Sequence, residues 1–136
     1  MTATHRVALS TTTDGPFDDA VARVREALAA QGFGVLTEID VKATLNKKLG
    51  EGVGDEVGDY LILGACNPQF ANRAVRLYPQ IGVLLPCNVV LRSGPGATIV
   101  VDAMNPALMV GVTEEPALAE IADEVGSRLQ SALDSL

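Results

Sequence analysis

The two cysteines are the side chains best suited to chemistry, and each is followed by an asparagine. Cys66-Asn67 and Cys87-Asn88 fall in two of the most apolar segments of the chain. Asn-Pro is a turn signal and a proline is tolerated in the first turn of a helix. We therefore expect a central unit, around which the remaining chain packs, made of a strand over 59–65, the turn Cys66-Asn67-Pro68, a helix over 69–78 and a strand over 82–91.

Cys66 has two readings that the sequence leaves open. If Asn67 caps the following helix, the sulfur lies near unpaired N–H groups and the positive end of the helix dipole, which favours the thiolate. Cys66 would then be the more reactive thiol. Alternatively it is a small buried residue at a tight turn, since free cysteine is among the most buried residue types.

Cys87 resembles a core residue, because it shares a face of the expected strand with Val83, Leu85, Val89 and Leu91. The cysteines do not form a CxxC motif, so redox pairing requires a fold that brings their Cα atoms within about 7 Å. A metal site could combine both sulfurs with Glu38, Asp40 or His5. That set lacks the ligand spacing of a closed zinc site, so we expect no metal.

Two carboxylates lie on one side of an expected strand over 33–40. Glu38 and Asp40 could act as a general acid and base. Such a pair is also typical of the solvated end of a strand, and we favour Asp40 as the cap of a helix that begins at Val41.

Two asparagines could orient a ligand through their amide groups. Asn67 is equally explained as a turn residue before a proline. Asn88 is less ordinary, because an asparagine in the middle of an apolar strand requires a hydrogen-bond partner.

These residues define a candidate ligand site, provided that folding gathers them in one neighbourhood open to solvent: Glu38, Asp40, Cys66, Asn67, Cys87 and Asn88. The function this favours is a small-ligand or thiol-dependent binding domain. The alternative is a dimeric interaction protein without chemistry. An enzyme with Cys66 as nucleophile ranks third, because the sequence places no base beside it.

Common catalytic and nucleotide-binding motifs are missing. The sequence contains no P-loop, no GxSxG and no HExxH. The segment 50–58 has four glycines, but it does not complete GxGxxG, it follows a helix, and its acidic residues would repel phosphate. We predict a mobile loop there.

Composition bounds the class of protein. A chain of 136 residues with 48% hydrophobic and 20% charged residues is expected to form a single globular domain over 1–136. Only 4% are aromatic, and the net charge is −7, which disfavours nucleic acid and anionic membranes as partners. No signal-peptide pattern or 18-residue apolar run is found, so we expect a cytoplasmic protein with reduced thiols.

The remaining pattern predicts alternating strands and helices. Before the central unit we expect a strand over 4–10, a helix from Asp14-Gly15-Pro16 to Gly32, the strand over 33–40 and a helix over 41–49. After it we expect a turn at 93–96, an antiparallel strand over 97–103, a short helical turn over 105–109 and a last helix capped at 113–116. This order describes a two-layer α+β domain with a mostly antiparallel sheet.

Three motifs carry a resemblance to a known family. They are Phe33-Gly34-Val35-Leu36-Thr37-Glu38-Ile39-Asp40-Val41-Lys42, Leu63-Gly64-Ala65-Cys66-Asn67-Pro68 and Leu84-Leu85-Pro86-Cys87-Asn88-Val89-Val90. In this order and spacing the chain resembles the family catalogued as domain of unknown function 302. The resemblance implies a curved antiparallel sheet with helices on one face, similar to the TATA-box-binding-protein-like arrangement, often as a homodimer. It implies no reaction or cofactor.

Overall fold

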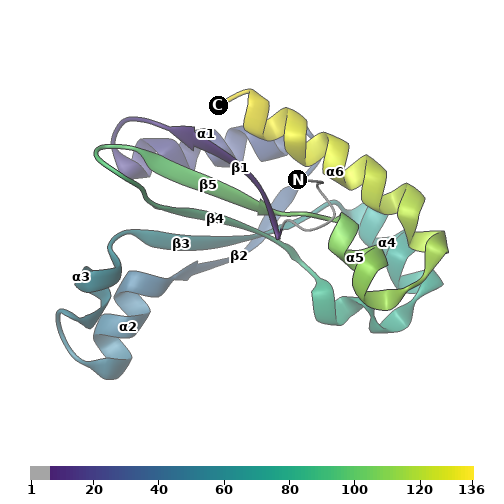
Figure 1. Ribbon diagram of the computed structural model, residues 1–136, viewed down its shortest axis with the longest axis horizontal. Helices are drawn as coiled ribbons and strands as arrows, with labels where there is room; N and C mark the ends of the chain where they lie inside the picture. The colour runs from purple at the N-terminus through teal and green to yellow at the C-terminus, as the bar shows by residue number, and fades with distance from the viewer. Residues whose placement is uncertain (1–6) are drawn as a thin grey trace.

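Five strands form one open, curved sheet in the computed structural model, which describes residues 7–136 (Figure 1). The strands are β1 (Ala8–Thr13), β2 (Gly34–Asp40), β3 (Tyr60–Cys66), β4 (Cys87–Ser93) and β5 (Ile99–Met104). Their order across the sheet is β1-β5-β4-β3-β2, and every neighbouring pair is antiparallel. The predicted α+β class is confirmed.

Helices lie on one face and at the ends of this sheet (Figure 1). They are α1 (Phe17–Ala30), α2 (Val41–Leu49), α3 (Val53–Val57), α4 (Pro68–Leu77), α5 (Ala107–Thr113) and α6 (Ala119–Asp134), with 3₁₀ turns η2 (Pro79–Leu84) and η3 (Pro116–Leu118). The long helices α1 and α6 lie side by side over the strands (Figure 1). Val24 and Leu28 of α1 and Leu129 of α6 are buried, as the spacing of their apolar residues predicts.

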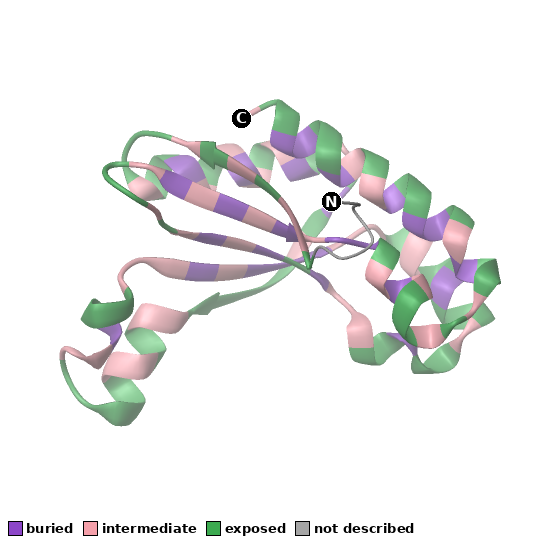
Figure 2. Cartoon of the chain, viewed as in Figure 1, coloured by how far each residue is buried: buried purple, intermediate pink, exposed green. Residues whose placement is uncertain are grey.

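Strand residues alternate between this covered face and an open face (Figure 2). In β4, Cys87, Val89 and Leu91 are buried in the core, whereas Asn88 and Val90 point to the other side. Val90 belongs to a row of paired residues that crosses the open face from β1 to β2. In order, this row is Ser10, Asp102, Val90, Ile62 and Ile39. The covered face supplies the hydrophobic core, and the open face has no helix of its own.

Two strand boundaries differ from the prediction. β1 begins at Ala8 and continues to Thr13, and residues 4–6 of the predicted strand lie outside the described part of the chain. The predicted strand over 82–91 is a 3₁₀ turn in its first half, and β4 begins only at Cys87. Pro86 explains this start, because a proline has no N–H to donate to a strand ladder.

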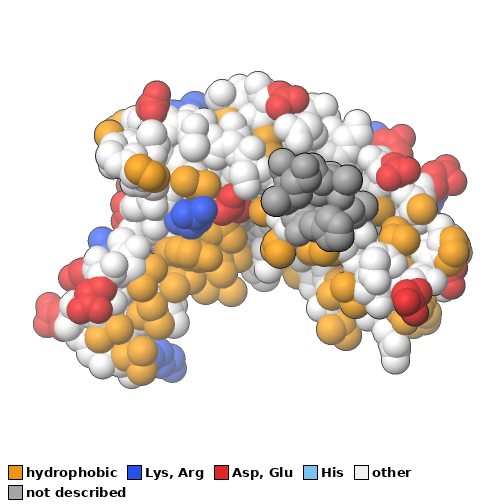
Figure 3. Space-filling view, viewed as in Figure 1, with side chains coloured by type: hydrophobic (Ala, Val, Ile, Leu, Met, Phe, Trp, Pro, Cys, Tyr) orange, Lys and Arg blue, Asp and Glu red, His pale blue; other side chains and the backbone are white. Residues whose placement is uncertain are grey.

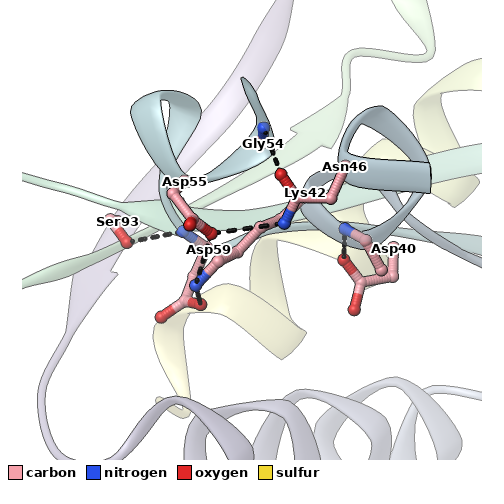
Figure 4. A network of polar contacts seen from close by, with 8 residues as sticks. Asp40, Lys42, Asn46, Gly54, Asp55, Asp59 and Ser93 are labelled. Atoms are coloured by element: carbon pink, nitrogen blue, oxygen red, sulfur yellow. Dashed lines mark hydrogen bonds and ion pairs between the residues drawn. The ribbon is translucent and has the colours of Figure 1, made fainter. Parts of the chain in front are cut away.

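The glycine-rich segment 50–58 is not a loop, so the prediction of a mobile loop was wrong. It contains α3, which packs against α2. The side-chain oxygen of Asn46 accepts a hydrogen bond from the Gly54 N–H at 2.6 Å, and its amide nitrogen donates to Asp55 at 3.2 Å (Figure 4). Lys42 lies between Asp55 and Asp59, at 4.0 and 3.6 Å. We call residues 41–57 the α2–α3 arm.

Gly54 permits the close approach of α2 and α3, because a Cβ atom there would collide with the carbonyl oxygen of Lys42. We predict that Gly54→Ala destabilises the protein by about 1–3 kcal/mol, as expected for overpacking. Gly111→Ala is the matched control, since a Cβ atom at Gly111 meets open space. Urea unfolding of both variants measures the difference, and equal stabilities would contradict this account of the arm.

Candidate functional site

An apolar cleft lies at the end of β3, between α4, α5, α6 and the segment Leu85-Pro86 that leads into β4. Its cavity volume is about 30 Å³, within about 370 Å³ of empty space that includes open solvent. Its lining includes Cys66, Asn67, Phe70, Cys87, Met109 and Val125, and none of its lining residues carries a full charge at neutral pH. We call it the thiol cleft.

Asn67 positions the first wall of the thiol cleft. Its side-chain oxygen accepts hydrogen bonds from the backbone N–H groups of Gln69, at 3.1 Å, and Phe70, at 3.4 Å. This confirms the predicted cap of α4, whose first residue is Pro68. Cys66 immediately precedes the cap and is only partly buried, so its thiol lies at the wall of a cleft that solvent reaches.

Cys87 forms a second wall, deeper in the protein. Ala65 pairs with Cys87 across β3 and β4, which makes Cys66 and Cys87 neighbours. Burial, together with the nearby Cys66, raises the pKa of the Cys87 thiol from 9.0 to about 11. Cys87 is 6% exposed, so the predicted core position is confirmed. Both cysteines are free thiols.

Glu38 and Asp40 lie at the other end of the sheet. Asp40 pairs with Leu61, five residues before Cys66 on β3, which corresponds to about 17 Å along the strand. The two carboxylates line a separate polar cleft with Asp18 and Asp59. The predicted common neighbourhood of acids and thiols is therefore not formed.

Each of these carboxylates has a local partner. Glu38 forms an ion pair of 3.3 Å with Arg25 of α1. Asp40 accepts the N–H of Ala43 at 2.9 Å, which confirms it as the cap of α2. Because general base catalysis requires hydrogen-bond reach, Asp40 cannot directly activate Cys66 in this arrangement.

Asn88 also lies away from the thiol cleft. It is exposed on the open face of the sheet, opposite Gly64. Water can therefore satisfy its amide in mid-strand. Of the six predicted site residues, the structure brings together Cys66, Asn67 and Cys87.

The lining residues other than Cys66, Asn67 and Cys87 were not predicted from the sequence, and three of them show why. Phe70, Met109 and Val125 come from α4, α5 and α6. Phe70 carried a partial signal, because it lies in the first turn of the helix that Asn67 was expected to cap. The other two depend on which helices pack together, and periodicity within a single helix does not reveal that.

The described residues, 7–136, contain neither a metal cluster nor a membrane-spanning helix. In this part of the chain no group of three or more His, Cys, Asp and Glu side chains could hold a metal ion. His5, one of the sequence candidates, lies outside the described residues. No described helix has the length and hydropathy of a membrane span.

Comparison with known proteins gives the family. The model of the family described as "Domain of unknown function DUF302" matches residues 9–136. The chain belongs to the DUF302 family. The resemblance inferred from the three sequence motifs is thus confirmed for this DUF302 chain.

A solved structure of another family member has the same fold. It is the crystal structure of an uncharacterized conserved DUF302 protein from Bacillus stearothermophilus, at 30% sequence identity and a TM-score of 0.84. The match covers 94% of this DUF302 chain and 96% of the other. No curated protein matches the chain.

The raised pKa of Cys87 predicts a loss of stability at alkaline pH. Between about pH 9 and pH 11 the folded state keeps a proton that the unfolded state has released, so the free energy of unfolding falls as the pH rises. The fall is at most about 3 kcal/mol. Chemical denaturation of wild type and Cys87→Ala across this range measures it as a difference in slope.

The matched control is Cys66→Ala. Burial is the larger cause of the shift, so this variant should retain most of the pH dependence. A wild-type slope identical to that of Cys87→Ala would refute the prediction.

Proposed function

We propose that this protein is a small-ligand binding domain whose site is the thiol cleft, with the Cys66 thiol at its wall. The observation that supports this most directly is the shared lining of one solvent-open apolar cleft by both thiols and Asn67. Ligand sites are commonly concave and mostly apolar, with a few polar groups that fix orientation. The proposal keeps the cytoplasmic compartment expected from the sequence, where thiols stay reduced.

The two thiols have different roles in this proposal. Cys66 is partly exposed and therefore available to a ligand or an electrophile. Cys87 is buried and protonated at neutral pH, so it contributes apolar surface to the floor of the site. The free amide nitrogen of Asn67 supplies a hydrogen-bond donor, because its oxygen is occupied in capping α4.

Protection of Cys66 from alkylation tests this site. Iodoacetamide should modify Cys66 in the native protein and leave Cys87 unmodified until denaturant is added. Indole, a small neutral apolar probe, should slow the modification several-fold by occupying the cleft. Mass spectrometry of the labelled peptides measures both rates.

A cleft-filling variant provides the control. Ala71 of α4 lines the thiol cleft, so Ala71→Leu should abolish protection by indole. Ala43→Leu, at an exposed site of α2, should leave it unchanged. If both cysteines remain unreactive until unfolding, or if indole gives no protection in the wild type, the proposal fails.

We also infer that the open face of the sheet joins two copies of the chain in a homodimer. Hydrophobic side chains gather in the hollow between the α2–α3 arm and the α5 end of the molecule (Figure 3). Ile39 of β2 is 49% exposed and Leu49 of the arm 68%. Exposed apolar patches of this kind mark interaction surfaces.

Charge pairing on this face favours a second copy as the occupant. Arg92 donates to Asp102 at 3.0 Å, and Ser10 also donates to Asp102, at 2.6 Å. The ion pair balances the charge of Asp102 on the open face, in a chain that carries −7 overall. Two such faces can therefore meet without the repulsion that the rest of the surface would produce.

Size-exclusion chromatography with light scattering tests the dimer. Val90 lies in the middle of the open face, opposite Ile62 and Asp102, so Val90→Lys should convert the dimer to a monomer. Val75→Lys is the control, because Val75 is 43% exposed on α4, which the proposed interface does not include. A wild-type protein that is monomeric at millimolar concentration would rule the interface out.

A further inference from the structure

A cation, Arg128, lies beside the thiol cleft. Its contacts within the protein do not use all of its hydrogen-bond donors. Arg128 of α6 places its guanidinium carbon 5.2 Å from the centre of the Phe70 ring, and Phe70 lines the cleft. Val125, one turn earlier on α6, lines the cleft as well. Arg128 is not itself a lining residue, but its contact with Phe70 places it beside the cleft, where α4 and α6 pack together.

The Nε atom of Arg128 is buried and has no hydrogen-bond partner among the described residues. Its nearest carboxylate oxygen, from Glu124, is 3.7 Å away, which is too long for a hydrogen bond. A buried donor without a partner is costly, and native proteins usually satisfy it with a water molecule or a ligand. The Nη1 atom is already fixed by donating to the backbone oxygen of Gln31 at 3.2 Å.

A second donor faces the same place. A methyl group at Gly32 would lie 3.0 Å from the amide nitrogen of Asn67 and 3.4 Å from Nη1 of Arg128. The amide nitrogen of Asn67 makes no hydrogen bond to the described residues, since only its oxygen is used in capping α4. The amide nitrogen of Asn67, a residue of the cleft lining, thus lies close to the Nη1 atom of Arg128.

A second guanidinium adds positive charge. Arg73 of α4 lies 5.8 Å from the centre of the Phe70 ring. Its own carboxylate partner, Glu120, is 3.9 Å away and 84% exposed. Exposed ion pairs of this length contribute little, so Arg73 can turn to an incoming anion at small cost.

We propose that the thiol cleft binds a small organic anion, with an apolar body inside the cleft and a carboxylate-like head at Arg128 and Asn67. This proposal rests on the function proposed above and names the chemical class of its ligand. The uncharged lining of the cleft accepts the body. The planar guanidinium suits a carboxylate, and the Asn67 amide supplies one further donor.

A pair of matched probes separates charge from shape. Phenylacetate and phenylacetamide share an aromatic ring and a similar outline, but only the first is an anion at neutral pH. We expect phenylacetate to bind roughly fivefold more tightly or better, as partly buried charged hydrogen bonds allow. Chemical-shift titrations of the backbone amides around Cys66 and Phe70 measure both dissociation constants.

Variants of equal charge assign the effect to Arg128. Arg128→Gln should reduce the preference for phenylacetate to near unity and leave the affinity for phenylacetamide unchanged. Arg76→Gln removes the same charge from an exposed position of α4, where Arg76 contacts Asn72. This control should retain the preference.

A measurement on the wild type keeps the test decisive if Arg128→Gln does not fold. The Nε–H resonance of Arg128 should shift on addition of phenylacetate and remain in place with phenylacetamide. The inference is overturned if the two probes bind equally or if Arg128→Gln keeps the preference for phenylacetate. It is also overturned if the Nε–H resonance of Arg128 does not shift on addition of phenylacetate. Binding of indole without any preference for the anion would overturn this inference alone, whereas failure of indole and both matched probes would also remove the proposed function.

Discussion

The antiparallel pairing of β3 with β4 is the constraint on which the rest of the structure depends. It joins the central strand β4 to β3 and places Ala65 opposite Cys87, so that a partly exposed thiol and a buried one become neighbours. The same register aligns Ile62 with Val90 on the other side. A shift of the register by one residue would exchange the two faces and destroy both the core and the thiol cleft.

Local signals made much of the fold readable from the sequence. Asp40 and Asn67 were recognised as caps because their short polar side chains precede helices, and each does accept backbone N–H bonds. The hairpin between β4 and β5 followed from a turn rich in glycine and proline. The spacing of apolar residues identified α1 and α6, since each must bury one face.

The sequence-based predictions were wrong where a few specific contacts, and not the local composition, decide the secondary structure. Glycine and acidic residues suggested a loop at 50–58, yet Asn46 and Lys42 supply the partners that order α3. Alternating apolar residues suggested a strand from Gly82, but Pro86 cannot join the ladder. The structure brings together the sulfur half of the candidate site, because Cys66, Asn67 and Cys87 are linked by a turn and a strand pair. Its acidic half was misplaced, because the residue types do not show that β2 runs away from the thiols.

Gly64 lies at the boundary between the thiol cleft and the open face. An added Cβ atom there would collide with the hydroxyl of Thr37 and the ring of Pro86, a residue of the cleft wall. At Gly64 only the backbone of β3, which carries no side chain there, lies between the thiol cleft and the open face. The protein is consequently committed to the smallest residue at that position, and neither surface can be redesigned there without altering its neighbour.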